Sequence, residues 1–122
     1  MKFSEDFGNT QYRIREYGPG WIRVNEQRLT HPFILSPEQL VPDWLPATLD
    51  QLQPVHLKPL LDYGAEIILI GTGPQHRQPP AAAWQTLIQG GSGFELMETG
   101  AACRTLSVLL SENRRTIAAL FP

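Results

Sequence analysis

An uninterrupted apolar segment in the middle of the chain covers residues 67–70, which are three isoleucines and a leucine. An apolar run of this length with β-branched residues is typical of a strand covered on both faces of a sheet. It leads directly into the glycine loop Gly71-Thr72-Gly73-Pro74. We therefore take residues 66–74 as a buried core strand with its exit loop, and interpret the rest of the chain around it.

Two helices and two more strands are predicted after this loop. Apolar residues recur at helical spacing over 81–89, and residues 94–97 form a short apolar run typical of a strand. Thr99 is a suitable cap for a helix that continues to about residue 112, and residues 116–120 supply the last strand. This β-α-β-α-β order predicts a parallel sheet with right-handed crossovers.

The residue pattern in the first third of the chain predicts antiparallel strands. Residues 11–17 alternate in the period-two pattern of a half-exposed strand, and residues 21–24 form a second strand after the turn Gly18-Pro19-Gly20. Residues 33–35 are predicted as a third strand, so that the opening segment is a small β meander.

The segment between the meander and the core strand is rich in proline. Residues 36–44 are predicted as a loop. The run Thr48-Leu49-Asp50-Gln51 matches a capping box and predicts a short helix. Pro59 suits the first turn of another short helix, which Gly64 would end.

Length and charge narrow the functional classes. A chain of 122 residues fits one domain over residues 1–122, with residues 1–10 expected to be frayed. A net charge of −2 argues against binding to nucleic acid or an anionic membrane, which requires a concentrated basic surface. The single Cys103 favours a reducing compartment. No apolar run is long enough to insert into a membrane, so we expect a soluble, cytoplasmic protein of bacterial type.

A candidate crevice follows from the predicted topology. Ligands in parallel α/β folds favour the carboxyl ends of the strands, where Gly71–Pro74 and Glu98–Gly100 should converge. The second loop opens a helix whose free N–H groups suit an anion. A dinucleotide-binding loop is not supported, because His76 stands where a third glycine belongs. A tight turn out of the buried strand explains the two glycines more simply, with ligand contact as the alternative.

Two residues of the following helix have competing interpretations. Cys103 lies near the helix start, where the dipole favours a thiolate, but it also shares an apolar stripe with leucines and is more simply a core residue. Arg104 faces another side, where a guanidinium suits a carboxylate or phosphate. Its alternative is a salt bridge to Glu95 or Glu98 that fixes the helix on the sheet.

No complete catalytic group is recognisable. The histidines show no metal-ligand spacing and no partner for nucleophilic catalysis, so surface or loop positions are expected for all three: His31, His56 and His76. We therefore expect no catalytic residue, no metal and no cofactor, and do not favour an enzyme. The candidate ligand or partner crevice consists of Gly71, Thr72, Gly73, Thr99, Cys103 and Arg104.

A family resemblance adds to this interpretation. Three runs carry it, with Leu109-Leu110 and Arg114-Arg115 beyond them: Ile67–Gly73, Gly93–Thr99 and Ala101-Ala102-Cys103-Arg104-Thr105. Together they resemble the Mth-type domain family, whose biochemical function is unknown and which includes the mitochondrial complex I assembly factor 3 and an adipogenesis-associated protein. The Tyr-Asn pair usual after the last run is Leu106-Ser107 here.

The resemblance implies a three-layer α/β domain with a central mixed, largely parallel sheet flanked by helices and a small N-terminal antiparallel β extension. It also implies a protein-binding or assembly module, in respiratory or membrane complex biogenesis by analogy with relatives. The alternative is a small-molecule protein or enzyme that binds an anionic ligand at the crevice. A homodimer remains compatible with exposed aromatic residues such as Trp21 or Trp44.

Overall fold

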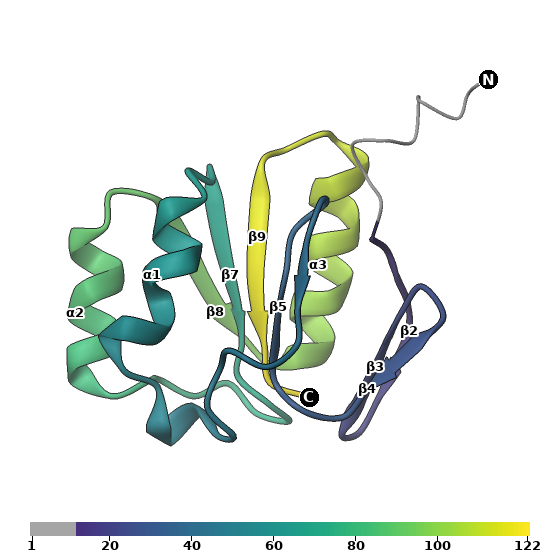
Figure 1. The fold of residues 1–122 in the computed structure, drawn as a ribbon, viewed down its shortest axis with the longest axis horizontal. Helices are drawn as coiled ribbons and strands as arrows, with labels where there is room; N and C mark the ends of the chain where they lie inside the picture. Colours follow the sequence, from purple (N-terminus) through teal and green to yellow (C-terminus); the bar gives the residue numbers. More distant parts are fainter. Residues whose placement is uncertain (1–11) are drawn as a thin grey trace.

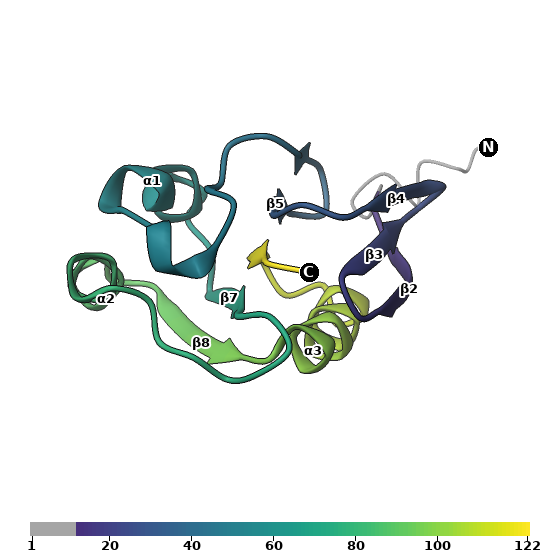
Figure 2. The same cartoon turned by 90° about the horizontal axis from the view of Figure 1, so that it is seen from below.

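A computed structural model describes residues 12–122, and the expectation of a frayed segment at 1–10 lies outside the described residues. Two sheets and three α-helices make up this part of the chain. The larger sheet has five strands in the order β6-β5-β9-β7-β8, and the smaller has the order β2-β3-β4. Helices α1 and α2 cover one face of the larger sheet, whereas α3 and the smaller sheet lie on the other (Figures 1 and 2). The predicted mixed α/β fold is confirmed.

The second half of the chain forms the predicted parallel unit. Its elements are β7 (Ile67–Gly71), α2 (Ala81–Gln89), β8 (Gly93–Met97), α3 (Thr99–Ser111) and β9 (Thr116–Leu120). Strand β7 lies between β8 and β9 and is parallel to both. Its side chains point alternately into two cores, because Ile68 and Ile70 belong to one buried cluster and Leu69 to the other. A strand covered on both faces needs this apolar run.

The N-terminal sheet contains the predicted hairpin, but its third strand was placed wrongly. Strands β2 (Ile14–Gly18) and β3 (Trp21–Val24) pair in antiparallel orientation, and the third strand is β4 (Gln27–Leu29). Asn25, with a φ of 52°, makes the tight turn into β4. The polar composition of Gln27-Arg28 concealed this strand, since only Leu29 is buried.

The segment 33–41 joins the larger sheet. Strand β5 (Phe33–Leu35) pairs antiparallel with β9 and with β6 (Leu40–Val41). Two expectations are corrected here, since residues 33–35 are not part of the meander and residues 36–44 are not entirely loop. All three β5 residues are buried, because they lie between a strand on each side and a core on each face.

The helices before β7 also differ from the prediction. Residues Leu49–Gln51 form only a 3₁₀ turn, and the Thr48 side chain makes no capping hydrogen bond. Helix α1 (Pro54–Asp62) begins at Pro54 rather than Pro59, with reciprocal capping between Gln53 and His56. Pro59 therefore lies inside the helix. Proline has no backbone N–H, so the carbonyl one turn earlier accepts no helical hydrogen bond from this position. That carbonyl lies near the exposed start of the helix, where a water molecule can donate the hydrogen bond instead.

The described residues pack into two apolar cores on opposite faces of the larger sheet. Helices α1 and α2 close one core, while α3, β3 and β4 close the other. Among residues 12–122, none of the helices combines the length and apolar character that a bilayer crossing requires.

Candidate functional site

The two predicted loops meet at the carboxyl ends of the parallel strands. The backbone N–H of Gly73 donates to the Thr99 hydroxyl at 2.8 Å, and the N–H of Thr99 donates to the Gly73 carbonyl at 2.8 Å. The Thr99 hydroxyl itself donates to the carbonyl of Phe121 at 2.7 Å. Thr99 thus joins the ends of β7, β9 and α3. It was expected to cap α3, but its hydroxyl is used for these tertiary contacts instead.

Glu98 is the residue that caps α3. Its two carboxylate oxygens accept hydrogen bonds from the backbone N–H groups of Gly100 and Ala101, both at 2.9 Å. A carboxylate at this position also interacts favourably with the helix dipole. The anion-binding position predicted at the start of α3 is therefore occupied by the protein's own carboxylate.

Gly71 and Thr72 lie behind the surface of the crevice. A Cβ atom on Gly71 would approach Leu120 Cδ2 and the Thr99 hydroxyl oxygen, each at 3.0 Å, so a glycine lets α3 pack closely on β7. Thr72 is buried, and its hydroxyl donates to the Gln75 carbonyl at 2.6 Å. The structural role expected for the glycine loop is visible here, whereas ligand contact by these residues stays a prediction.

A crevice of about 500 Å³ opens beside these loops. Glycine, proline and apolar side chains supply most of its lining, from four segments: Tyr17–Gly20 with Ile22, Gly73-Pro74, Glu98–Gly100 and Pro122. Of the six predicted site residues, only Gly73 and Thr99 reach it. The crevice lies between the turn of the first hairpin, the start of α3 and the end of the chain.

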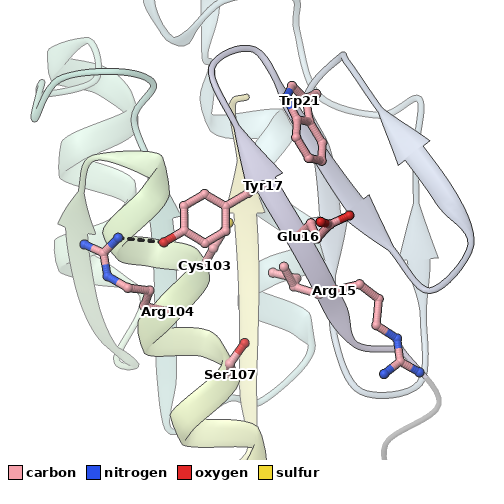
Figure 3. Close-up of a pocket in the computed structure, with 8 residues that line it drawn as sticks. Arg15, Glu16, Tyr17, Trp21, Cys103, Arg104 and Ser107 are labelled. Carbon is pink, nitrogen blue, oxygen red and sulfur yellow. Dashed lines mark hydrogen bonds between the residues drawn. The ribbon is translucent and has the colours of Figure 1, made fainter.

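A separate cavity of about 570 Å³ lies between α3 and the edge of β2 (Figure 3). Cys103, Arg104 and Ser107 line it from the helix, and the segment Ile14–Tyr17 with Trp21 lines it from the hairpin. Four of the predicted crevice residues are thus divided between two neighbouring cavities, whereas Gly71 and Thr72 line neither of them. Tyr17 contributes to both.

Arg104 is held by two groups of the protein. Its guanidinium donates to the Tyr17 hydroxyl at 2.7 Å, as Figure 3 shows, and lies 3.6 Å from a carboxylate oxygen of Glu98. The hydrogen bond with Tyr17 is the main cause of its raised pKa. The side chain is 62% exposed, so the salt bridge to Glu98, one of the two alternatives for this residue, is a weak one.

Cys103 belongs to the apolar core. Its side chain is buried, and burial is the main cause that raises the pKa of its thiol to about 12. The neighbouring Glu98 raises this pKa further, whereas Arg104 lowers it. Desolvation therefore outweighs the favourable charge of Arg104, and the thiol is neutral near pH 7.

Three parts of the site were missed in the sequence: Tyr17, the turn Gly18–Gly20 and the C-terminal Pro122. Tyr17 lies 87 positions from Arg104 in the chain, and no local pattern indicates that the hairpin packs beside α3. The turn itself was predicted, because Pro-Gly is a strong turn signal, but its position over the strand ends depends on tertiary packing. Within residues 12–122, no cluster of three His, Cys, Asp or Glu side chains is placed to hold a metal ion.

Comparison with known proteins gives one family and several relatives of known structure. The family described as "Protein of unknown function (DUF498/DUF598)" matches residues 14–121. Two solved structures show the same fold. One is an NMR structure from Xanthomonas campestris, with 38% identity, coverage of 91% of this chain and 84% of that chain, and a TM-score of 0.81. The other is an NMR structure from Bordetella pertussis described as a Mth938-like domain, with 26% identity, coverage of 100% and 92%, and a TM-score of 0.78.

Two curated relatives have names that refer to membranes or respiratory complexes. A protein of Francisella tularensis named 13 kDa major membrane protein is 33% identical over 104 residues, which cover 83% of each chain. The human NADH dehydrogenase (ubiquinone) 1 alpha subcomplex assembly factor 3 is 30% identical over 111 residues, which cover 89% of this chain but only 60% of the human protein. The resemblance inferred from the sequence is thereby confirmed.

Proposed function

This chain belongs to the DUF498/DUF598 family, and we propose that it is a partner-binding module that acts in the assembly of a larger protein complex. The observation that carries the proposal is the chemistry of the strand-end crevice, where Glu98 already occupies the N–H groups at the start of α3. What remains accessible is largely glycine, proline and apolar surface. Such a surface suits a protein segment better than an anionic metabolite.

The crevice is itself a rigid surface, and this rigidity favours the binding of a partner. Pro19, Pro74 and Pro122 line it and have little conformational freedom to lose, and the neighbouring Gly73 is fixed by its two hydrogen bonds with Thr99. Binding to a preorganised surface loses less entropy than binding to a mobile one. We take this crevice as the main contact for a partner.

The similarity to an assembly factor suggests which kind of protein the partner is. A role in respiratory complex biogenesis comes from the name of the human relative, whose sequence extends well beyond the matched part. We propose that the partner is a subunit or fellow assembly factor of such a complex. We place the chain in the cytoplasm, where the buried, unpaired Cys103 would remain reduced, and treat residues 1–122 as one domain.

The proposal is tested by comparing two variants of the full chain in its own cell. Pro74 is exposed in the crevice, so Pro74→Arg adds bulk and charge there without disturbing a core. Ser111→Arg adds the same charge at the exposed far end of α3 and is the control. Quantitative affinity purification should show specific partners of the wild type that Pro74→Arg loses and Ser111→Arg retains. Equal recovery with both variants would contradict the proposal.

Binding of an anionic ligand is the second candidate function, and one observation favours it. Arg104 is mostly exposed and lines the cavity of about 570 Å³ together with the hydroxyl-bearing Tyr17 and Ser107. These groups suit a carboxylate or phosphate. The ligand would have to compete with Tyr17 and Glu98 for the guanidinium, so we rank this function below partner binding.

A further inference from the structure

The outer edge of β8 is a second surface suited to a protein partner. Among the described residues, the four sheet-edge strands are β2, β4, β6 and β8. Strand β2 is interrupted by an irregular register between Ile14 and Glu16, while β4 has three residues and β6 has two. Strand β8 has five residues in unbroken register with β7. Bulges and short length protect edge strands from pairing, and β8 has neither. The loop through His76 and Gln78 lies beside β8 across a small cavity, but it makes no backbone hydrogen bond to Phe94 or Leu96.

The hydrogen-bond pattern shows which backbone groups of β8 face outward. The carbonyl of Met97 accepts a hydrogen bond from the N–H of Thr72, so the backbone of Met97 faces β7. Because these orientations alternate along a strand, Glu95 also faces β7, whereas Phe94 and Leu96 present their N–H and C=O groups to the outside. In the part of the chain that the structure describes, no backbone hydrogen bond from a loop or another strand reaches these two residues on the outer side.

The two faces beside this edge differ in character. Phe94 and Leu96 pack on the core closed by α2, where Trp84 meets Phe94 edge to face at 5.5 Å between ring centroids. Ile88 lies one helical turn after Trp84 and is 53% exposed. Glu95 points to the opposite face of the sheet and is exposed. Figure 2 shows β8 as the outer member of the row β5, β9, β7 and β8.

Glu95 supplies the charge that selects a partner. No Lys, Arg or His lies within salt-bridge distance of its carboxylate anywhere in residues 12–122. A small cavity of about 170 Å³ adjoins it, with His76 and Gln78 on its other side. A cationic side chain from a neighbouring strand would therefore find an unpaired carboxylate with space beside it.

We propose that β8 accepts an extended segment of a partner protein as a sixth strand, with apolar residues towards Trp84 and Ile88 and a Lys or Arg opposite Glu95. The proposal rests on the partner-binding function above and adds a second contact to it. Outward N–H and C=O groups of Phe94 and Leu96 would bond the added backbone, as in other cases of strand addition. Alternation of apolar and basic residues would give the segment its specificity.

A second copy of this chain is a poorer occupant of the edge. In a two-fold antiparallel pairing that bonds Phe94 to Leu96 of the other copy, the two Glu95 residues would stand directly opposite one another. Like charges in that position destabilise a sheet. The same charge that attracts a basic segment therefore disfavours this self-pairing.

The test starts with a display library of random segments of about nine residues, selected on the wild-type chain, since strands usually have about 3–10 residues. We expect selected segments to alternate apolar and basic residues. Their affinity should fall about tenfold for Glu95→Lys, which replaces one cross-strand ion pair with repulsion. It should also fall for Ile88→Asp, which places a charged group against the apolar side of the segment. Asp43→Lys makes the same charge change at another exposed acid, and Val108→Asp the same polar change at an equally exposed helix position, so both controls should bind normally.

Amide hydrogen exchange locates the bound segment. In the free protein, the Phe94 and Leu96 amides should exchange faster than that of Glu95, and a saturating peptide should slow both. Peptides that bind Glu95→Lys unchanged, peptides that leave these two amides unprotected, or a selection without binders would overturn the proposal. Protection of both amides through dimer formation, seen by sedimentation without peptide, would assign the edge to a second copy and also overturn it.

The outcome separates the two contacts. Loss of cellular partners in Pro74→Arg with full retention in Glu95→Lys leaves the crevice function intact and removes the β8 proposal. Loss of the partners in Glu95→Lys with full retention in Pro74→Arg would show that the crevice is not the main contact, and would support binding at the β8 edge.

Discussion

Gly73 and Thr99 hold each other through two reciprocal hydrogen bonds of 2.8 Å, although 26 positions separate them in the chain. The backbone N–H of each residue is bonded, one to a hydroxyl and the other to a carbonyl. Because the same hydroxyl also donates to Phe121, this pair fixes the β7 exit loop, the start of α3 and the C-terminus in one arrangement.

Removal of the Thr99 hydroxyl should therefore destabilise the whole fold. Thr99→Val keeps the shape of the side chain but leaves the N–H of Gly73 and the carbonyl of Phe121 without a partner in a buried site. We expect a loss of about 1–3 kcal/mol in the free energy of unfolding, measured by urea denaturation with an unchanged m-value. Thr99→Ser, which retains the hydroxyl, is the control and should lose clearly less. Equal losses in both variants would contradict the role assigned to the hydroxyl.

Much of this arrangement was predictable from local sequence patterns. The apolar run of β7, the helical spacing of α2 and the convergence of two loops at parallel strand ends all follow from period and order along the chain.

The remainder depends on contacts that no local pattern records. Two of the three β4 residues are polar, and the strand is held by its pairing with β3. Pro59 is tolerated inside α1 because that part of the helix lies near an exposed end. Thr99 was a plausible cap by residue type, but the choice between Thr99 and Glu98 depended on where Gly73 and Phe121 lie in three dimensions. Tyr17 reached the site only through hairpin packing on α3.

Glu98 should determine whether the start of α3 binds anions. In the wild type its carboxylate occupies two N–H groups, so sulfate should not raise the melting temperature beyond its general salting effect. Glu98→Ala should lose about 0.5–2 kcal/mol from the missing cap and recover part of that stability with sulfate. The measurement is a thermal melt in sodium sulfate against chloride of equal ionic strength. Asp43→Ala, another exposed acid outside the site, should show no such recovery.

The thiol of Cys103 should be unreactive in the folded protein. Burial and a pKa of about 12 leave almost no thiolate at pH 8, so an aromatic disulfide reagent should react at a rate limited by unfolding. Addition of denaturing urea should restore the rate of an ordinary thiol. Rapid labelling at pH 8 without urea would show that the site opens locally and would contradict the core assignment.

The same pKa has a consequence for stability at high pH. The folded-state pKa of about 12 lies above the ordinary value of 9.0, so the folded protein binds the thiol proton more tightly than the unfolded chain. This contribution is fully present below pH 9 and is lost as pH rises towards 12, by about 1.4 kcal/mol per pH unit at most. The difference in unfolding free energy between wild type and Cys103→Ala should therefore shrink above pH 9. A difference that stays constant up to pH 11 would contradict the raised pKa.

Arg104 separates the two candidate functions. Its side chain is largely exposed, so Arg104→Ala should leave the free energy of unfolding almost unchanged. If the cavity between α3 and β2 takes an anionic ligand, a panel of carboxylate and phosphate metabolites should contain one that raises the melting temperature of the wild type but not of Arg104→Ala. Tyr17→Phe removes the hydroxyl that holds the guanidinium and should weaken that shift without abolishing it. If no metabolite produces a shift in the wild type at millimolar concentration, the ligand-binding function is ruled out for that panel, and the crevice bounded by Gly73 and Thr99 is left as the favoured contact on this side of the protein.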